Sequence, residues 1–506
     1  MTIDAPRRAD EGRHWRAAGA AIQGTIVVAD TIDVDICVIG AGSGGLSVAA
    51  GAVQMGARVA LVEKHKMGGD CLNYGCVPSK SLLAAAHAAA VQRAPGKFGV
   101  AAHEPQVDFA KVHDHVHGVI AAIAPIDSVE RFTGLGVKVI LGTARFAGPR
   151  EVIAQTSAGE TRIRAKWIVI ATGSRAAVPP IPGLDTVPYL TNETIFERTT
   201  RPEHLIVVGG GPIGLEMAQA HCRLGARVTV LELFAIMPKD DPELVEIVRK
   251  RLTGEGVALL EQTKVLRVEK RSAGIAVEIE RQGKREFVEG SDILVAAGRT
   301  ANVDGLDLDK AGVAATKRGI TVDARLRSTN KRVFAIGDAA GGYQFTHVAG
   351  YHAGIVIRQA LFRLFWTRAD TGAVPWVTFT DPELAHVGLS EAEANKRHGE
   401  VRVLRWPFHD NDRAQAERVT EGLIKVIATR RGRILGADIV GKSAGELIHP
   451  WVLAVANGMK VSQLAGYIAP YPTLGEVGKR AAGSYFTPAL FSERTKRVVR
   501  FLLRFA

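Results

Sequence analysis

Two cysteines with four residues between them, Cys71 and Cys76, lie in a glycine-rich run over residues 68–80. A dithiol at this spacing can close to a disulfide and reopen during turnover, because thiols and disulfides exchange through a thiolate. Lys80 and a nearby helix start would lower the pKa of a cysteine in this run. The glycines would let a flat partner approach the backbone closely. The run therefore predicts a redox-active dithiol beside a planar group.

A complete dinucleotide-binding pattern precedes the cysteine run. Over residues 34–63 an apolar strand, a G-x-G-x-x-G loop, an Ala-rich helix and a second strand follow one another. In this pattern Gly40 would make the tight turn, Gly42 would let a pyrophosphate approach and Gly45 would let the helix pack on the strand. Glu63, which ends the second strand, could accept hydrogen bonds from a ribose. We therefore expect a nucleotide site whose phosphates lie at the helix N-terminus.

The same pattern occurs a second time, over residues 205–232. Gly209, Gly211 and Gly214 occupy the glycine positions, and Glu232 ends the second strand. In both copies the acid lies 23 residues after the first glycine. One glycine pattern is weak evidence because glycine turns are common, whereas two complete units at equal spacing favour two nucleotide sites. Since the cysteine run continues from the first unit, we expect a flavin nucleotide there and a nicotinamide nucleotide in the second.

Two further apolar stretches end in small residues, at 168–174 and 334–339. Asp338 in the second stretch could accept hydrogen bonds from ligand hydroxyls, or it could cap a helix N-terminus instead. From about residue 375 the apolar residues alternate as in an antiparallel sheet, and no nucleotide loop occurs. This last region is expected to be a separate module that could supply a proton-transferring group to the dithiol.

The composition, with 47% hydrophobic and 23% charged residues in 506, is that of a soluble globular protein of roughly three to four domains. The net charge of +12 comes from dispersed basic residues with few aromatic neighbours, so nucleic-acid binding is not expected. Four cysteines are too few for a secreted disulfide scaffold, which favours a cytoplasmic location. No apolar stretch reaches the roughly 18 residues of a membrane span. No metal site is expected, because no cluster has metal-ligand spacing.

Residues 33–482 resemble the pyridine nucleotide–disulfide oxidoreductases, the group of glutathione reductase, dihydrolipoamide dehydrogenase and mercuric reductase. Residues 68–78 match the active-site pattern of the group at every defined position. Four shorter matches follow in the order of the group, at 171–173, 297–299, 335–338 and 379–383. The resemblance implies an α/β fold with two Rossmann-like dinucleotide-binding domains, for FAD and NAD, and a C-terminal α+β dimerisation domain.

The resemblance also implies a homodimer joined through the C-terminal module. Cys71 would meet the substrate, and Cys76 would contact the flavin as a thiolate. Lys80 would lie near the reactive flavin nitrogen, paired with Glu216 from the helix of the second unit. The cofactor-binding residues expected in all are Gly40, Gly42, Gly45, Glu63, Lys80, Thr172, Gly173, Asp338, Gly209, Gly211, Gly214, Glu232, Gly298 and Arg299.

The chain departs from the group at the C-terminal catalytic motif. Most disulfide reductases of the group carry a His-Pro there, with a Glu four residues after the Pro, and the His acts as acid and base across the dimer interface. Here Tyr471 stands at the His position and Glu476 at the Glu position. Mercuric reductases also carry a tyrosine, but they usually end in a cysteine pair, and no cysteine follows Cys222 here. Tyr471 and Glu476 are therefore candidate catalytic residues, with Glu476 orienting Tyr471 or a water.

The sequence thus predicts a mercuric-reductase-like FAD enzyme. Electrons would pass from NAD(P)H through the flavin to a Cys71–Cys76 disulfide, and on to a small-molecule or metal-ion acceptor. NAD(H) is expected over NADP(H), because Glu232 would repel a 2′-phosphate. Two alternatives stay open: a dihydrolipoamide dehydrogenase that oxidises a dithiol with NAD, and a non-catalytic flavoprotein that serves as a redox sensor or membrane-associated scaffold.

The expected domain order places the second nucleotide unit inside the first. The segments are a flexible extension (1–30), the first part of the FAD domain with the redox disulfide (31–185), the NAD(P) domain (186–305), the second part of the FAD domain (306–372), the dimerisation domain (373–485) and a basic amphipathic tail (486–506). Such a tail could make peripheral contact with an anionic membrane, or it could dock on the dimer.

Overall fold

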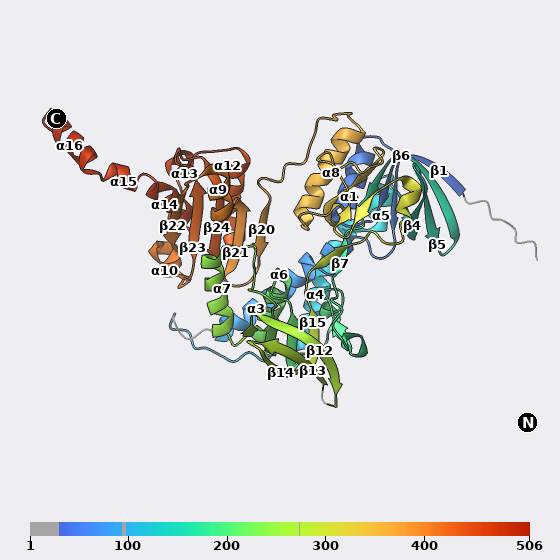
Figure 1. Ribbon diagram of the computed structural model, residues 1–506, viewed down its shortest axis with the longest axis horizontal. Helices are drawn as coiled ribbons and strands as arrows, with labels where there is room; N and C mark the ends of the chain where they lie inside the picture. Colours follow the sequence, from blue (N-terminus) through green and yellow to red (C-terminus); the bar gives the residue numbers. More distant parts are fainter. Residues whose placement is uncertain (1–29, 94–97, 273, 506) are drawn as a thin grey trace, which may run out of the picture.

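The computed structural model describes residues 30–93, 98–272 and 274–505, so the expected extension 1–30 lies outside these residues except for Asp30. Figure 1 shows three bodies: the first holds the blue N-terminal strands, the second the green segments and the third the orange and red C-terminal segments. The two nucleotide units form the first two bodies, and the alternating C-terminal region forms the third. The expected fold class, two Rossmann-like units with a C-terminal α+β module, is confirmed.

The first body is built on a seven-stranded sheet. Its strands are β1 (Asp30–Ile39), β2 (Val59–Glu63), β3 (Lys138–Leu141), β4 (Thr143–Gly148), β5 (Glu151–Thr156), β6 (Gly159–Ile170) and β19 (Val333–Ala335). They lie in the order β3-β2-β1-β6-β5-β4, with β19 also on β6. The β4 and β5 strands are antiparallel and the others parallel. All five residues of β2 are buried, because helices and loops cover both faces of a parallel sheet.

Helices between and after the strands of the first sheet carry the cysteine run and close the first glycine loop. They are α1 (Ser43–Gln54), α2 (Gly69–Asn73), α3 (Cys76–Arg93), α4 (Phe109–Ile123), η1 (Ala124–Asp127), α5 (Val129–Gly134), η4 (Leu308–Ala311), η5 (Gly337–Ala340) and α8 (Thr346–Ala360). The α1 and α8 helices pack side by side against the sheet (Figure 1). The cysteine helix α3 packs on both α4 and α6 (Pro212–Arg223). Leu82 of α3 and Val116 of α4 belong to the buried apolar cluster of the second body, so these two helices lie with that body (Figure 1).

The second body contains a five-stranded parallel sheet and an antiparallel meander. The parallel strands are β8 (Tyr189–Leu190), β9 (His204–Val208), β10 (Arg227–Leu231), β11 (Ala258–Leu260) and β15 (Asp292–Val295), in the order β11-β10-β9-β15-β8. The meander comprises β12 (Thr263–Arg271), β13 (Gly274–Arg281) and β14 (Lys284–Gly290). Further helices are η2 (Leu184–Thr186), η3 (Ile195–Glu197) and α7 (Pro242–Gly254). Every residue of β9 is buried, which places the second glycine loop at the end of a central strand.

The third body is an antiparallel sheet with helices packed against it. Its strands, in the order β20-β21-β24-β23-β22, are β20 (Pro375–Thr378), β21 (Glu383–Gly388), β24 (Ile434–Gly441), β23 (Leu423–Ala428) and β22 (Arg402–Pro407). Its helices are α9 (Glu391–His398), η6 (Phe408–Asp410), α10 (Asp412–Ala416), α11 (Ala444–Leu447), α12 (His449–Ala456), α13 (Val461–Gly466) and α14 (Glu476–Ser484). All eight residues of β24 are buried, so this strand forms the centre of the module.

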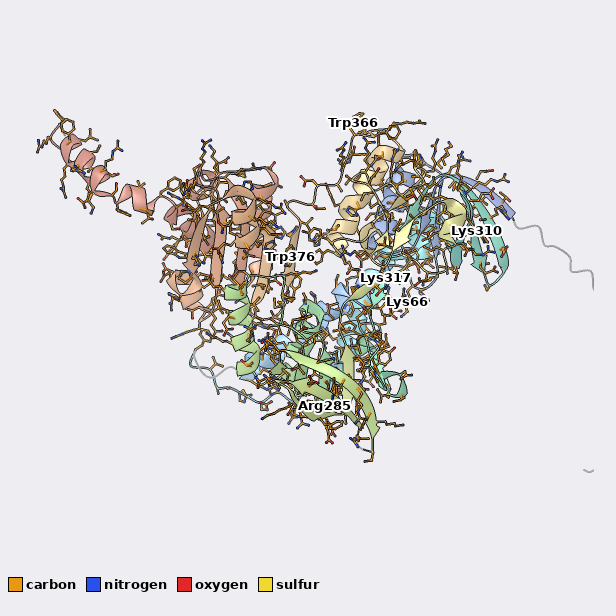
Figure 2. The ribbon with its side chains drawn as sticks, viewed as in Figure 1. Lys66, Arg285, Lys310, Lys317, Trp366 and Trp376 are labelled. Atoms are coloured by element: carbon orange, nitrogen blue, oxygen red, sulfur yellow. The ribbon has the colours of Figure 1, made fainter. Side chains whose placement is uncertain are left out.

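Short contacts join the bodies. The strands β7 (Ser174–Ala176) and β16 (Arg299–Ala301) pair where the chain leaves and re-enters the first body. A separate short hairpin is formed by β17 (Ala315–Thr316) and β18 (Gly319–Ile320). Trp376, labelled near the centre of Figure 2, donates a 2.7 Å hydrogen bond to Asp240 and so ties the third body to the second. The residue boundaries expected for the domains stay a prediction.

The C-terminal tail projects away from the third body (Figure 1). It contains α15 (Thr487–Leu490) and α16 (Glu493–Leu502), and none of the residues in these two helices is buried. Within the described ranges, no helix is both long and apolar enough to cross a membrane.

Candidate active site

The two cysteines of the run lie on neighbouring helices. Cys71 lies within α2, and Cys76 is the first residue of α3. Gly75 connects the helices, and a Cβ at this position would lie 2.9 Å from Asp70 Oδ2, so the turn disfavours a larger residue. Both cysteines are free thiols, which means that the structure presents the dithiol form of the pair.

The two thiols differ strongly in acidity. A hydrogen bond with Cys71 is the largest influence that lowers the pKa of Cys76, which falls to about 6. Thr346, whose Oγ1 lies 3.4 Å from the Cys76 sulfur, and the charge of Lys80 lower this pKa as well. The same hydrogen bond with Cys76, together with burial, raises the pKa of Cys71. Near neutral pH, Cys76 is therefore a thiolate and Cys71 keeps its proton.

A buried carboxylate ties the cysteine helix to α6 and to the third body. Glu216 on α6 is 4% exposed, and its Oε2 accepts a 2.7 Å hydrogen bond from Lys80 Nζ on α3. Its Oε1 accepts a 3.0 Å hydrogen bond from the backbone N–H of Phe379 in the third body. The Lys80 ammonium also lies 4.3 Å from the centre of the Phe379 ring, a cation–π contact. The pair implied by the resemblance is thus in contact, while its role in turnover stays a prediction.

Asp338 belongs to a polar network that reaches Asp70, near the start of the cysteine run. It lies within η5, whose N-cap is Ile336, so it does not cap a helix. The Ser174 hydroxyl donates to Asp338 Oδ2 at 2.5 Å, and Arg299 Nε donates to Ser174 Oγ at 2.7 Å. Arg299 Nη2 lies 3.1 Å from Asp70 Oδ2. Burial raises the pKa of Asp338. Arg299 thus points towards the first site and the dithiol.

The first glycine loop leads into α1, and its residues fit a dinucleotide. A Cβ at Gly45 would lie 1.9 Å from the carbonyl oxygen of Gly40, so the helix packs on the loop only with glycine there. Gly42 is the N-cap of α1, and the first turn holds neither an acidic residue nor a side-chain cap. Its N–H groups and the helix dipole therefore favour a phosphate. Glu63 lies beside the loop and accepts the N–H of Ala41 at 2.6 Å.

The second glycine loop repeats this arrangement at α6. Glu232 accepts the backbone N–H of Gly210 at 2.6 Å and that of Phe234 at 2.9 Å. A Cβ at Gly214 would lie 2.0 Å from the carbonyl oxygen of Gly209, whereas a Cβ at Gly211 would have nothing within 4 Å. The loop is therefore closed on its helix side and open where a pyrophosphate would approach, which fits a second dinucleotide.

Thr172, Gly173 and Gly298 lie where the chain crosses between the first two bodies. The Thr172 hydroxyl donates a 2.6 Å hydrogen bond to the carbonyl oxygen of Asn302. Gly173 and Gly298 have φ values of 68° and 118°, and a Cβ at either would meet nothing within 4 Å. Their contacts with a cofactor stay predictions.

Tyr471 and Glu476 lie at the surface of the third body. Tyr471 is 69% exposed and lies before α14, which begins at Glu476. The Tyr471 hydroxyl donates a 2.9 Å hydrogen bond to Asp412 Oδ2, and this bond is the main cause that raises the pKa of Tyr471. Asp412, rather than Glu476, is therefore the residue that orients Tyr471 within one chain. No contact between described residues joins Tyr471 to Cys71.

Four side chains of the site were not predicted from the sequence: Thr346, Asp70, Ser174 and Asp412. Asp70 and Ser174 are sequence neighbours of predicted residues, so adjacency could have identified them. Thr346 and Asp412 carry no local signal, because each reaches its partner only in the folded chain.

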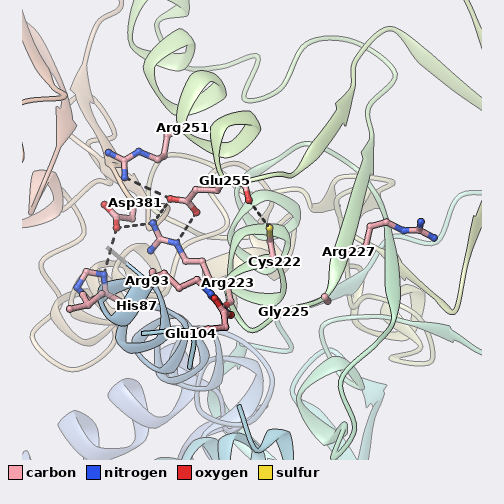
Figure 3. A pocket seen from close by; sticks show the side chains of 13 residues that line it. His87, Arg93, Glu104, Cys222, Arg223, Gly225, Arg227, Arg251, Glu255 and Asp381 are labelled. Atoms are coloured by element: carbon pink, nitrogen blue, oxygen red, sulfur yellow. Dashed lines mark hydrogen bonds and ion pairs between the residues drawn. The ribbon is translucent and has the colours of Figure 1, made fainter. Parts of the chain in front are cut away.

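A cavity of about 610 Å³ lies at the C-terminal ends of α3 and α6 (Figure 3). Several of its charged groups are paired, and Arg223 lies 2.6 Å from Glu255 and 2.9 Å from Asp381. The Cys222 thiol donates to the carbonyl oxygen of Glu255 at 3.3 Å, so its hydrogen-bond partner is Glu255 and not a cysteine of the run. The cavity contains none of the predicted catalytic residues.

Comparison with known families gives two adjacent matches. Residues 34–353 match the family described as pyridine nucleotide-disulphide oxidoreductase, and residues 374–482 match the dimerisation domain of the same family. The second match supports a homodimer.

The chain is similar to characterised reductases and dehydrogenases along most of its length. It is 36% identical over 459 residues to a mercuric reductase of Streptomyces lividans, covering 89% of this chain and 96% of that protein. It is 37% identical over 474 residues to a dihydrolipoyl dehydrogenase of Thermus scotoductus, covering 90% and 98%.

Two solved structures share the fold. The Cu(II) complex of the HOCl-induced flavoprotein disulfide reductase RclA from Escherichia coli has a TM-score of 0.80 and 26% identity, covering 90% of this chain and 99% of that one. LpdA from Mycobacterium tuberculosis has a TM-score of 0.82 and 27% identity, covering 89% and 99%.

Proposed function

This chain belongs to the pyridine nucleotide-disulphide oxidoreductase family, and we propose that it is an NADH-dependent reductase whose Cys71–Cys76 pair hands electrons to an acceptor, as a mercuric reductase does. At the level of the family, the protein is a flavoprotein disulfide oxidoreductase that uses FAD and a pyridine nucleotide. The observation that carries the finer proposal is the unequal dithiol together with a tyrosine, Tyr471, in place of an imidazole.

The unequal dithiol assigns different tasks to the two sulfurs. The flavin, when bound, supplies the two-electron link between nicotinamide and the cysteines. The Cys76 thiolate is held by the Thr346 hydroxyl and the Lys80 charge, so it stays deprotonated beside that site. Cys71 keeps its proton and must lose it before its sulfur can attack an acceptor.

Reduction of a disulfide acceptor would need two proton transfers. The Cys71 sulfur, after losing its proton, bonds to one acceptor sulfur, and the other acceptor sulfur leaves as a thiolate and takes up a proton. The Cys76 thiolate then attacks Cys71, which closes the Cys71–Cys76 disulfide and releases the second acceptor sulfur as a thiolate. Two electrons leave the pair, and the second thiolate becomes a thiol only when it takes up a further proton from solvent. A histidine would carry these protons near neutral pH, whereas a tyrosine of pKa about 10 is a poor base there.

Acceptors that need no proton shuttle should therefore react best. Soft metal ions bind thiolates directly, so electrons can pass to them without protonation of a leaving sulfur. Tyr471, whose pKa is raised by Asp412, would keep its proton in the hydrogen bond to Asp412 and would not serve as a base. Reduced cysteines and NADH are both maintained in the cytoplasm, where we place the reaction.

A steady-state screen with NADH tests this proposal. The acceptors are Hg(II), Cu(II), a quinone, lipoamide and glutathione disulfide. A metal ion or the quinone should turn over at least about tenfold faster than either disulfide, because the general acid–base step is weak. Cys71→Ser and Cys76→Ser should abolish the activity, whereas Cys222→Ser, outside the run, should retain it. Full activity in both run variants would instead support a non-catalytic flavoprotein.

A dihydrolipoamide dehydrogenase is the second candidate. The 37% identity to the Thermus scotoductus enzyme and the Glu232 carboxylate at the second loop favour it. The tyrosine at position 471 argues against it, because dithiol oxidation needs a base near neutral pH. Lipoamide as the fastest acceptor of the screen, with comparable dihydrolipoamide oxidation by NAD, would select this function over the first.

The nicotinamide nucleotide is proposed to be NADH. Glu232 lies at the end of β10, where a carboxylate can bind a ribose diol and would repel a 2′-phosphate. The residues that follow it, 233–238, include no arginine or lysine that could offset this charge.

The tail is proposed to contact an anionic membrane surface. On α16 and the residues after it, Phe501, Leu502 and Phe505 are 56%, 59% and 76% exposed. The same segment carries basic residues at positions 494, 496, 497, 500 and 504, with one acid at 493. A helix with a basic and an apolar face binds headgroups through charge and buries its apolar face among acyl chains. The charge complementarity favours lipid over a second copy of this basic chain.

Pelleting with vesicles tests the tail proposal. Full-length protein should pellet with anionic vesicles and not with neutral ones, and protein truncated after residue 491 should pellet with neither. Arg497→Glu combined with Arg500→Glu should weaken pelleting while the dimer persists. Equal pelleting by full-length and truncated protein would contradict lipid contact, and loss of the dimer on truncation would assign the tail to the dimer interface.

A further inference from the structure

Two histidines on one face of α4 and a glutamate from η3 face a common point. His113 and His117 are four residues apart, so their side chains are neighbours on the helix, with ring centres 4.1 Å apart. Glu197 ends η3, and its Oε2 lies 3.6 Å from His117 Nε2. One potential ligand atom from each residue lies within 4.8 Å of the other two. The sequence analysis predicted no metal-ligating cluster, because Glu197 joins the histidines only in the fold.

We propose that His113, His117 and Glu197 bind a divalent transition-metal ion such as Zn(II). Two histidines at positions i and i+4 of a helix form half of a well-known zinc arrangement, and a carboxylate from another element completes a His₂Glu set. Three protein ligands leave the fourth position of a tetrahedral ion to water.

The His117 imidazole faces two oxygen atoms. Its Nε2 lies 3.2 Å from the carbonyl oxygen of Phe196, a hydrogen bond, and 3.6 Å from Glu197 Oε2, which is too long for a good hydrogen bond. Two ligands bound at about 2.0–2.2 Å in a tetrahedral zinc site lie about 3.3–3.6 Å from each other. The separation of His117 and Glu197 therefore fits an ion that replaces the hydrogen bond to Phe196.

A neighbouring carboxylate prepares one imidazole for ligation. His113 Nδ1 lies 3.3 Å from Asp114 Oδ1, which favours the tautomer with the proton on Nδ1 and leaves Nε2 free to bind an ion. The exposed fractions of the His113, His117 and Glu197 side chains are 21%, 33% and 51%. The site is thus partly enclosed and still open to an ion from solvent.

The ion would fasten α4, which packs on the cysteine helix α3, to η3. Val116 of α4, Leu82 of α3 and Phe196 of η3 belong to one buried apolar cluster. The proposed ligands lie at the edge of this cluster and would join α4 to η3 across it. Binding should therefore raise the thermal midpoint of unfolding, because the ion binds only the folded arrangement.

Cobalt titration of the oxidised holoenzyme tests the site, because the closed Cys71–Cys76 disulfide offers no thiolate. One equivalent of Co(II) should give the visible bands of a tetrahedral ion without a sulfur-to-cobalt charge-transfer band, and Zn(II) should displace it. His113→Ala and Glu197→Gln should each weaken Co(II) binding by about tenfold or more. His115→Ala is the matched control, since this exposed histidine lies on the same helix outside the cluster.

Calorimetry with Zn(II) on the same variants gives an independent measure, and circular dichroism with flavin absorbance checks that each variant is folded. If His113→Ala is unfolded, the exposed Glu197→Gln and Asp114→Asn variants decide the result. Equal affinity in wild type and in Glu197→Gln would overturn the proposal. Absence of Co(II) and Zn(II) binding would overturn it too, as would binding that Cys71→Ser abolishes and the histidine variants retain.

Discussion

The Tyr471 hydroxyl donates a 2.9 Å hydrogen bond to Asp412 Oδ2, across 59 residues of sequence. The hydrogen bond and the negative charge of Asp412 favour the protonated hydroxyl and raise the pKa of Tyr471. A tyrosine held in this way keeps its proton over a wide pH range, and it is poorly suited to remove a proton from another group.

This pair predicts a measurable effect on the pH–rate profile. Asp412→Asn should bring the pKa of Tyr471 back towards its usual value of about 10, so activity that needs the protonated hydroxyl should fall at a lower pH than in wild type. Tyr471→Phe should lower the native rate by up to about 10²–10⁴-fold. Rates measured from pH 6 to pH 11 on both variants check this. Tyr467→Phe, a second tyrosine near Glu476, is the control and should change neither rate nor profile.

The same position predicts a change of acceptor. Tyr471→His introduces a group that titrates near neutral pH, so lipoamide and glutathione disulfide turnover should rise. The measurement is kcat/KM for each disulfide at pH 7, with a metal-ion acceptor measured in parallel. Rapid lipoamide turnover by wild type, within the common range of about 1–10³ per second, would contradict the proposed role of the tyrosine.

The Cys76 thiolate predicts a titration between pH 5 and pH 8. Its pKa is lowered to about 6, so reduced holoenzyme should gain the long-wavelength absorbance of a thiolate beside flavin as pH rises through 6. Thr346→Val removes one hydrogen bond to the thiolate and should move this midpoint to higher pH. Cys76→Ser should abolish the absorbance change, and Cys222→Ser should leave it intact. A midpoint unchanged in Thr346→Val would show that the Thr346 contact does not stabilise the charge.

Two variants of Glu216 should separate the contribution of its charge to stability from that of its hydrogen bond to Phe379. Glu216→Gln keeps an oxygen that can accept the Phe379 N–H, whereas Glu216→Leu leaves this N–H unpaired and Lys80 without a counter-charge. Leucine should therefore reduce the free energy of unfolding by about 1–3 kcal/mol, and glutamine by less. The cost of the lost charge is limited because Lys80 is 38% exposed and water screens it. Urea unfolding followed by fluorescence measures the free energy of unfolding of both variants. Equal losses of stability in Glu216→Leu and Glu216→Gln would contradict the separate role of the hydrogen bond.

The second glycine loop predicts separate effects on folding and binding. A Cβ at Gly214 would lie 2.0 Å from the Gly209 carbonyl oxygen, so Gly214→Ala should destabilise the protein by about 1–3 kcal/mol. A Cβ at Gly211 meets nothing within 4 Å, so Gly211→Ala should leave the thermal midpoint unchanged. It should raise KM for NADH, because the added methyl would stand where the pyrophosphate approaches. Unchanged KM in Gly211→Ala would place the nucleotide elsewhere.

The carboxylate of Glu232 predicts the choice of nucleotide. Wild type should have a higher kcat/KM with NADH than with NADPH, and Glu232→Gln should narrow the ratio by removing the charge that repels a 2′-phosphate. Glu63→Gln, at the matching position of the first loop, should leave the ratio unchanged. A higher wild-type kcat/KM with NADPH would refute the expected preference.

Local patterns in the sequence were sufficient for the elements that carry the two nucleotide loops. The second pattern, expected over 205–232, begins with the strand His204–Val208 and ends just after the strand Arg227–Leu231. Such elements are readable because apolar runs, glycine turns and a terminal acid are properties of neighbouring residues. The cysteine run is readable for the same reason, since its two thiols lie five residues apart on two consecutive helices.

Only the tertiary structure decided which side chains act together across the chain. Lys80 meets Glu216 across 136 residues, and Ser174 meets Asp338 across 164, because the packing of α3 on α6 and of β6 beside β19 brings them together. The sequence alone determined the fold class, the family and the dithiol, since each rests on a contiguous pattern. The unequal acidity of the two thiols depends on Thr346, a residue distant in sequence, because a pKa follows the charges and hydrogen bonds that surround a group in space.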